Sequence, residues 1–358
     1  VASGIPRIDF KDNTKGALLL EPQRTNSIQY SEDFSQGWTA SSITIGSASS
    51  ISPDGTLNAF NIKSSTISGG KYIYDDNSVS ISTTYTLSGF FKKKTHDFAS
   101  LLINQRTSSF AFIGQLAVNI DLVNGVIDTQ TFATAPTLVN SKIENYGNGW
   151  YRVSLTATTS STGAIIRSCV GLAGSTSSFE YSGTILDEVY CFGIQLEQGS
   201  YAASYIPTSG SPVTREADVC DNGANSEVIN STEGVLYAEI SALADDLTNR
   251  FIVISDGISY TNGSVELYYY SGSNRIRGTF RTSAGVQADI NYALSDITQN
   301  SKFALKWKVN DFSLWVNGIE VGTGLSGTVN PIGTFTNISF SRNNSDNFYG
   351  KTKDLRVY

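Results

Sequence analysis

The sequence predicts an all-β protein made of two β-sandwich domains in series. Short runs of alternating apolar and polar residues recur along the whole chain, separated by Gly, Asn, Asp and Ser. Helical periodicity is almost nowhere visible. The chain has 358 residues, which is enough for roughly two domains of about 150 residues, each large enough to bury its own core.

The first half of the chain contains runs that fit the strands of one sandwich. In residues 151–157, Tyr151, Val153, Leu155 and Ala157 alternate with polar residues and should share one face of a strand. Further strands are expected at 86–91, 116–122, 165–172 and 186–196. The pairs Asn124-Gly125 and Asn148-Gly149 fall between such runs, and Asn-Gly favours tight hairpin turns.

A break in the strand pattern predicts the domain boundary. Residues 205–225 contain two prolines within a Ser- and Gly-rich stretch, followed by the polar run DNGANSE. We therefore expect one domain over 1–220, with an N-terminal extension and this connector, and a second over 221–358. The segment up to residue 219 should still pack on the first sandwich, because its apolar residues recur too often for a free linker, namely Tyr201, Tyr205, Ile206 and Val213.

A second series of strands follows the boundary. The alternating runs are 234–241, 250–255, 265–271, 274–282, 286–292, 301–309, 311–318, 337–342 and 351–358. Each is short and ends in turn residues, so the second half is also expected to be a sandwich.

Composition excludes several classes of partner. The formal net charge is -7, so a nucleic-acid backbone would be repelled. No stretch reaches 18 consecutive apolar residues, which excludes insertion of a helix into a membrane. Charged residues make up only 16%, and such a polar, weakly charged surface suits contact with neutral polymers. Methionine is absent, so we expect the chain to be a processed product or a piece of a longer protein.

No catalytic constellation is evident. The E-x-D-x-x-E pattern typical of glycosidases with a lectin-like fold is absent, and the clusters Asp187-Glu188 and Asp245-Asp246 lack the alternate spacing that would put two carboxylates on one strand face. The single histidine, His96, cannot build a His-rich metal site, and we expect it in a solvated loop. Cys169, Cys191 and Cys220 form no C-x-x-C pair and are expected to be buried free thiols, although Cys169 and Cys191 could face each other across a sheet. The sequence thus predicts a protein without enzymatic activity.

Two segments resemble a known family. Residues 16–38, GALLLEPQRTNSIQYSEDFSQGW, and 193–219, GIQLEQGSYAASYIPTSGSPVTREADV, resemble the opening and closing parts of a carbohydrate-binding-module-like β-sandwich found in bacteriophage tail and minor structural proteins. That module is usually followed by a lectin-like sandwich. The runs LWVNG and DLRVY near the C-terminus resemble a concanavalin-A-like or laminin-G-like domain, in which the last strand pairs near the first.

The resemblance implies a function. It indicates a non-catalytic carbohydrate-binding or adhesion component of a phage tail, located in the virion or outside cells, that recognises bacterial surface glycans. Its partners would be a glycan and other virion proteins, and a homotrimer is the expected assembly. Two alternatives remain open: a purely structural tail or baseplate protein, and the binding appendage of a larger polysaccharide-degrading enzyme.

Aromatic, amide and guanidinium side chains are the groups that bind sugars. In the second half, alternation directs one such set outward: Tyr268, Tyr270, Arg275, Arg277, Trp315 and Asn317. We expect this outward face to contact a glycan, and its arginines and lysines suit an acidic one. The alternative is that these side chains cover a sheet or pack against the first domain or another subunit.

The first domain offers a second candidate set. By likeness to jelly-roll carbohydrate-binding modules, a concave sheet or rim loop would use Tyr72, Tyr74, Asn104 and Arg106. Both sandwich classes often carry a structural calcium ion bound by oxygen ligands from an early loop and the last strand. Glu32 or Asp33 with Asp187 would match that arrangement, and the alternative is that all three are ordinary surface carboxylates.

Overall fold

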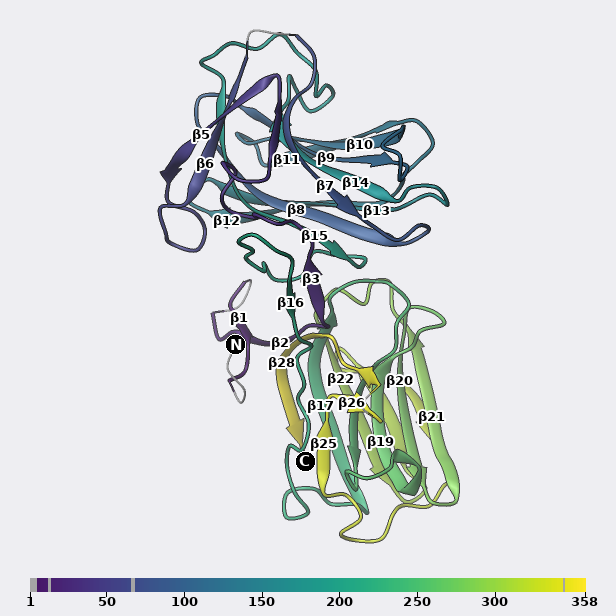
Figure 1. Ribbon diagram of the computed structural model, residues 1–358. Coiled ribbons are helices and arrows are strands. Elements are labelled where there is room, and N and C mark those ends of the chain that lie inside the picture. Colours follow the sequence, from purple (N-terminus) through teal and green to yellow (C-terminus); the bar gives the residue numbers. More distant parts are fainter. Residues whose placement is uncertain (1–4, 12–13, 66–67, 344) are drawn as a thin grey trace. The chain divides into compact units, whose positions relative to one another are not determined.

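The computed structural model describes residues 5–11, 14–65, 68–343 and 345–358, and it is built almost entirely of β-strands (Figure 1). The chain forms two compact units. The first sandwich is Gln23–Glu216, and the second sandwich combines Ala217–Tyr358 with the N-terminal segment up to Pro22. The predicted all-β class with two sandwiches is confirmed. Within the described ranges, no helix is long and apolar enough to cross a membrane.

Two antiparallel sheets form the first sandwich. The β9 sheet has the order β11 (Val126–Phe132), β10 (Phe112–Asp121), β9 (Phe98–Arg106), β14 (Ile165–Leu172), β7 (Lys71–Ser78) and β4 (Thr39–Ser41). The β8 sheet has the order β12 (Thr137–Gly147), β13 (Trp150–Thr158), β8 (Thr84–Lys93), β15 (Glu188–Gln198), β6 (Ala59–Ser64) and β5 (Ile43–Ser50). Both sheets contribute apolar side chains to one core, among them Leu87, Ile103, Val118, Leu155 and Val170.

Local sequence explains these strands. Val153, Leu155 and Ala157 of β13 all lie in the core, as the alternation predicts. The turn between β12 and β13 is the predicted Asn148-Gly149 pair, with φ angles of 51° and 77°. Both values lie in the left-handed region that Asn and Gly tolerate best, so this pair fixes the hairpin.

The connector packs on the first sandwich as far as β16. Strand β16 (Val213–Arg215) pairs with β3 (Arg24–Asn26). Upstream of it, the guanidinium of Arg152 donates a hydrogen bond of 2.7 Å to the carbonyl of Ala203. The ring of Tyr205 lies 5.4 Å from that of Phe192. These contacts bury the side of the β8 sheet that faces away from the core.

The N-terminal extension belongs to the second sandwich, which corrects the expected grouping of residues 1–220. Strand β2 (Ala17–Leu20) pairs with β28 (Gly350–Val357) near the end of the chain, and β1 (Ile8–Asp9) pairs with β2 (Figure 1). Arg7 forms ion pairs with Glu21 at 2.5 Å and with Asp218 at 2.7 Å. The sequence could not reveal this, because an edge strand joins whichever sheet edge is open to it.

Two sheets also form the second sandwich. The β17 sheet continues from β1, β2 and β28 through β17 (Glu233–Ala242), β22 (Ser301–Lys308), β23 (Phe312–Val316) and β24 (Ile319–Gly324). The β19 sheet has the order β21 (Gly285–Ala293), β20 (Arg275–Thr282), β19 (Gly263–Tyr269), β18 (Arg250–Ser255), β27 (Asp346–Asn347) and β26 (Ser341–Arg342). Strand β25 (Asn337–Ser339) also pairs with β18. The closing strand β28 lies beside β17, as expected.

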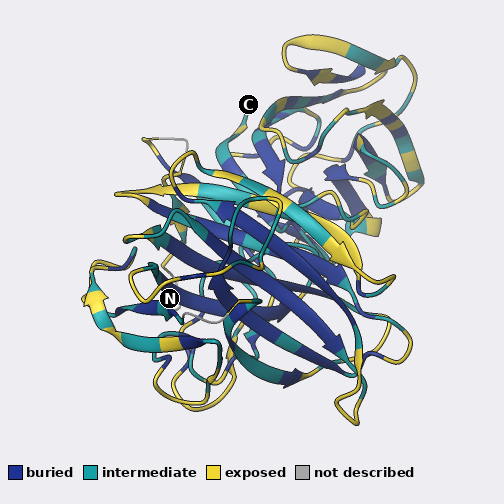
Figure 2. Ribbon diagram, turned by 90° about the horizontal axis from the view of Figure 1, so that it is seen from above, coloured by how far each residue is buried: buried dark blue, intermediate teal, exposed yellow. Residues whose placement is uncertain are grey.

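The core of the second sandwich lies between these sheets. It contains the predicted inward residues of several strands, among them Leu267, Phe280, Phe303, Trp307 and Leu314. The central strands are largely buried, whereas edge strands such as β11, β12 and β24 and the loop tips are largely exposed or half-buried (Figure 2). Strand β24 was not predicted, because its two glycines, Gly322 and Gly324, interrupt the alternation.

Candidate functional site

The outer face of the β19 sheet carries many polar and aromatic side chains. Val265, Leu267 and Tyr269 point to the core, so the alternate residues of β19 point outward. Across the strands, the outward residues form rows given by the register. One row is Asn337, Ser255, Ser264 and Arg281. The next is Ser339, Val253, Glu266, Thr279 and Asp289. The third is Asn347, Phe251, Tyr268, Arg277 and Asn291.

Four predicted residues lie on or beside this face, but Tyr268 is not available as a platform. Its side chain is outward as predicted, yet only 7% exposed. Its ring stacks on Phe251, and the Arg277 guanidinium lies over it at 5.6 Å. This burial raises the pKa of the Tyr268 phenol. Tyr270 and Arg275 remain exposed, and Arg275 donates to the Asn291 side chain at 2.5 Å.

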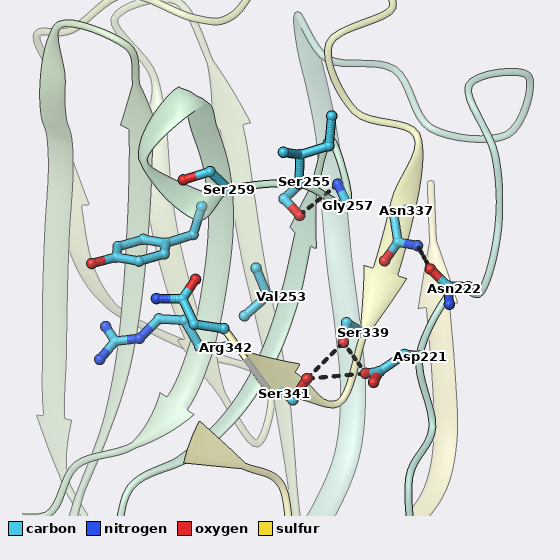
Figure 3. A pocket seen from close by; sticks show the side chains of 13 residues that line it. Asp221, Asn222, Val253, Ser255, Gly257, Ser259, Asn337, Ser339, Ser341 and Arg342 are labelled. Carbon is cyan, nitrogen blue, oxygen red and sulfur yellow. Dashed lines mark hydrogen bonds between the residues drawn. The ribbon is translucent and has the colours of Figure 1, made fainter. Parts of the chain in front are cut away.

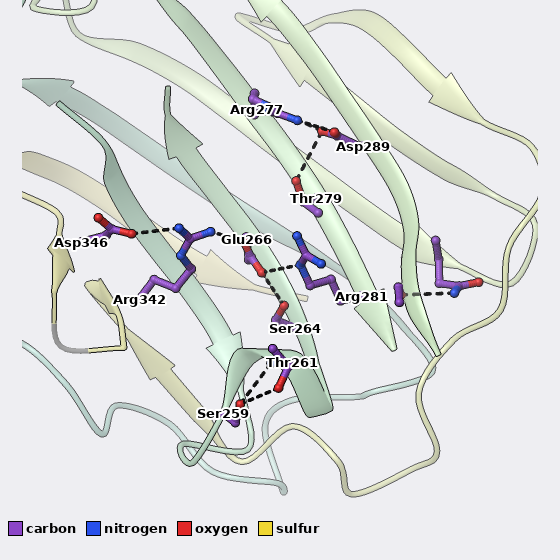
Figure 4. Close-up of polar contacts among 12 residues, drawn as sticks. Ser259, Thr261, Ser264, Glu266, Arg277, Thr279, Arg281, Asp289, Arg342 and Asp346 are labelled. Atoms are coloured by element: carbon purple, nitrogen blue, oxygen red, sulfur yellow. Dashed lines mark hydrogen bonds and ion pairs between the residues drawn. The ribbon is translucent and has the colours of Figure 1, made fainter. Parts of the chain in front are cut away.

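A buried carboxylate organises the centre of the face (Figure 4). Glu266 is inaccessible to solvent. Its Oε1 accepts hydrogen bonds from Ser264 Oγ at 2.7 Å and Arg281 Nε at 3.1 Å, and its Oε2 lies 3.6 Å from Arg342 Nη1. Arg342 also pairs with Asp346 at 2.9 Å. Because a buried charge is tolerated only when it is paired, this network fixes both arginines.

A polar pocket of about 380 Å³ opens at one end of the same face (Figure 3). Its floor comes from β18 and the neighbouring strands, with Val253 and Ser255 opposite Ser339 and Asn337 in register. Hydroxyl, amide, carboxylate and guanidinium groups line the remainder, together with the largely exposed Ile258. The pocket is therefore mostly polar, with an apolar side chain at its edge.

One wall of the pocket is the loop that ends in the short 3-10 helix η1 (Tyr260–Asn262). The Asp256 carboxylate accepts hydrogen bonds of 2.8 Å from the backbone N–H groups of Ile258 and Ser259 and from the Asn262 side chain. Partial burial raises the pKa of Asp256, but these hydrogen bonds outweigh it and lower the pKa overall. This loop presents Tyr260 beside the guanidinium of Arg342, 5.1 Å from its ring.

The opposite wall is residues 220–223. Gly223 and Ile338 exchange two backbone hydrogen bonds, of 3.0 and 2.7 Å, which hold this segment along β25. Asn222 adopts φ of 60°, a left-handed conformation that suits Asn. Its Oδ1 accepts a hydrogen bond of 3.0 Å from Asn337 Nδ2. Asp221 Oδ1 accepts hydrogen bonds from the hydroxyls of Ser339 and Ser341 (Figure 3).

Trp315 and Asn317 lie elsewhere, which corrects the expected single face. Trp315 lies in β23 and Asn317 directly after it. Strand β23 belongs to the β17 sheet, on the opposite side of the sandwich core. Trp315 is outward and 37% exposed, as predicted, between Ala304 and Glu320 in register. Asn317 lies in the turn after β23, where its Oδ1 accepts a hydrogen bond from Lys302 N–H. Alternation within one strand identifies an outward side chain but not which sheet carries it.

The four residues predicted in the first sandwich share one outer face of the β9 sheet. Register pairs Asp76, Arg167, Asn104 and Gln115 in one row, beside the row of Tyr74. Each group is engaged within the protein. Arg167 lies 3.7 Å over the Tyr74 ring and Asn104 donates to Gln115 at 2.9 Å. Arg106 donates to the Phe110 carbonyl. Tyr72 packs beside Tyr74, with ring centroids 6.2 Å apart.

The residues expected to bind calcium are not brought together. Glu32 accepts hydrogen bonds from Asn58 and Tyr205, and Asp33 from Ser35. Asp187 accepts from the backbone of Thr184 and lies 3.9 Å from His96. Across the described residues, no three His, Cys, Asp or Glu side chains are close enough to hold one ion. The donor set does not fit calcium, because these carboxylates cap separate loops.

The cysteines do not pair. All three thiols are free, and Cys169 and Cys191 are buried in different clusters. Burial raises the pKa of each thiol.

Most of the pocket is not predicted by the sequence. Asp221 and Asn222 belong to the polar run DNGANSE, which the strand pattern places in the connector, and no pattern distinguishes Tyr260 or Arg342. The run NISFSR did carry a signal, because its polar residues Asn337, Ser339 and Ser341 alternate with Ile338 and Phe340 and so share one outward face.

Comparison with known proteins yields only distant likenesses. No family model matches the chain, and no curated protein matches its sequence. Among solved structures, it is similar to sheep galectin-11 in complex with glycerol, with a TM-score of 0.26 and 6% identity over 37% of this chain and 94% of the galectin. It is also similar to domains LG4-5 of the mouse laminin alpha1 chain, with a TM-score of 0.29 and 12% identity over 82% of this chain and 86% of the other. At these scores, neither likeness carries an argument about function.

Proposed function

We propose that this protein is a non-catalytic carbohydrate-binding protein whose second sandwich binds a glycan in the pocket between residues 220–223 and η1. The observation that carries the proposal is the lining of that pocket. Hydroxyl, amide, carboxylate and guanidinium groups converge there beside the exposed Ile258. These groups supply both donors and acceptors for the hydroxyl groups of a sugar.

The biological setting extends this proposal. On the resemblance of residues 16–38 and 193–219 to phage tail modules, the protein would be an adhesion component of a virion that recognises glycans on a bacterial surface. A single shallow pocket binds weakly, so several copies, as in a homotrimer, would supply the avidity. The alternative hypothesis is a structural tail or baseplate protein, in which another virion protein covers the outer face of the β19 sheet.

A glycan array probed with the whole chain tests the proposal, followed by titration of the best ligand against two matched variants. Asn222→Gly removes the pocket amide while keeping the backbone conformation with φ of 60°. Asn317→Gly makes the same change at φ of 49° on the other sheet. We expect Asn222→Gly to weaken binding about five- to tenfold, the size of one net hydrogen bond, and Asn317→Gly to leave it unchanged.

Two results would overturn the proposal. One is that the folded chain binds no glycan on the array. The other is that both variants weaken binding equally, which would move the contact away from the pocket. Protection of the pocket residues from hydrogen exchange in an assembled particle, without any glycan binding, would favour the structural alternative.

A further inference from the structure

We infer that the pocket of the second sandwich takes a neutral saccharide and discriminates against acidic ones. This inference rests on the proposed function and names its ligand class. It differs from the prediction made from the sequence, in which the outward arginines of this face suit an anionic glycan.

Three arginines of the face, including the two beside the pocket, already pair with carboxylates. Arg277 pairs with Asp289, Arg281 with Glu266, and Arg342 with both Glu266 and Asp346. An anionic ligand gains little from a guanidinium that is bonded to a carboxylate, because it must first displace that partner. The arginines therefore serve to hold the sheet face together.

Carboxylates outnumber guanidinium groups around the pocket. Among the described residues, two guanidinium groups line the pocket or contact its lining, those of Arg281 and Arg342. Four acidic side chains do so, namely Asp221, Asp256, Glu266 and Asp346. Asp221 itself lines the pocket. A sugar carboxylate or sulfate would therefore meet a field of its own sign.

Asp221 is arranged as a hydroxyl acceptor. Ser339 and Ser341 both donate to its Oδ1. Its Oδ2 accepts no hydrogen bond from the part of the chain that the structure describes. A carboxylate oxygen held in place in this way accepts strongly from a neutral hydroxyl group.

The neighbouring amides complete the set of donors and acceptors. Asn337 Nδ2 donates to Asn222 Oδ1. The side-chain atoms left to face a ligand are therefore Asn222 Nδ2, a donor, and Asn337 Oδ1, an acceptor. Adjacent sugar hydroxyls can donate to Asp221 and Asn337 and accept from Asn222. This pattern fits a pair of neighbouring hydroxyls on one saccharide ring.

The test compares neutral oligosaccharides of glucose, galactose and mannose with their glucuronic, galacturonic and mannuronic acid counterparts, each titrated calorimetrically against the whole chain. We expect the neutral member of the bound pair to bind at least about tenfold more tightly, with little change between low and high salt. In Asp221→Asn, neutral binding should fall and acidic binding should rise, so that the ratio shifts about tenfold or more. Asp311→Asn, which removes a carboxylate from the other sheet, should leave the ratio unchanged.

The outcomes separate the two proposals. Equal or tighter binding of the acidic member overturns the neutral specificity and leaves glycan binding standing. An unchanged ratio in a folded Asp221→Asn variant, judged by its circular dichroism, also overturns it. If no member of either class binds, the proposed function fails and the specificity fails with it.

Discussion

The ring of Tyr268 lies flat against the ring of Phe251, with centroids 4.0 Å apart and an interplanar angle of 16°. Both residues are on the outer face of the β19 sheet, yet both are buried. Guanidinium groups complete the cover, with Arg342 at 4.0 Å from Phe251 and Arg277 over Tyr268. In the middle of this face, the two rings are therefore covered by guanidinium groups and are closed to a ligand. The pocket at the end of the face remains open to one.

The buried Glu266 should be important for stability. In Glu266→Gln, both arginines lose their shared carboxylate, and because each is partly exposed we expect a loss of about 2 kcal/mol in the free energy of unfolding. Hydrogen exchange of peptides from β18 and β19 measures this change, with the first sandwich as internal reference. Glu233→Gln is the control, since its pair with Lys308 is exposed. Equal effects of the two variants would refute the role of burial.

The two tryptophans of the second sandwich should respond differently to truncation. Trp307 is fully buried and its Nε1 donates to the Asn230 carbonyl at 3.2 Å, whereas Trp315 is partly exposed. We expect Trp307→Ala to cost about 3–5 kcal/mol and Trp315→Ala less than about 1 kcal/mol. Urea unfolding of each variant checks this. A large loss for Trp315→Ala would mean that the outer face of the β17 sheet is covered by another surface.

Acid should weaken the first sandwich partly through Asp54. Partial burial raises the pKa of this carboxyl, but hydrogen bonds from Ser52, Thr56 and Asn58 lower it more, to about 2. Because the folded-state pKa lies below the ordinary value, the stabilisation is full above about pH 4 and is lost as the pH falls towards 2. Thermal melts between pH 2 and 5 should be less pH-dependent in Asp54→Asn than in the native chain. An identical acid response in both would contradict this assignment.

The thiols should be nearly inert in the native state. Cys169 and Cys191 are completely buried and Cys220 is only partly accessible, and burial raises the pKa of all three. We expect a thiol reagent at pH 8 to modify only Cys220, slowly, and to modify all three once the chain is unfolded without reductant. Fewer than three reactive thiols after unfolding would reveal a disulfide.

For the predicted site residues, the sequence indicated the direction of a side chain within its strand but not its neighbours on other strands. Tyr270 and Arg275 are exposed beside the β19 sheet, because the alternation of VELYYYS and NRIRGTFRT fixes side-chain direction within a strand. The same reasoning could not foresee that Arg277 would cover Tyr268. Nor could it separate Trp315 from Tyr268, since strands of different sheets carry the same pattern.

The sequence by itself determined the β class, the two cores and the direction of most side chains, because a period of two residues is a local property of the chain. The tertiary structure alone decided that β2 pairs with β28 and that residues 220–223, η1 and Arg342 enclose one pocket. Those relations join segments about 40 to more than 300 residues apart, and they depend on which sheet edges and loop ends meet once both cores have formed.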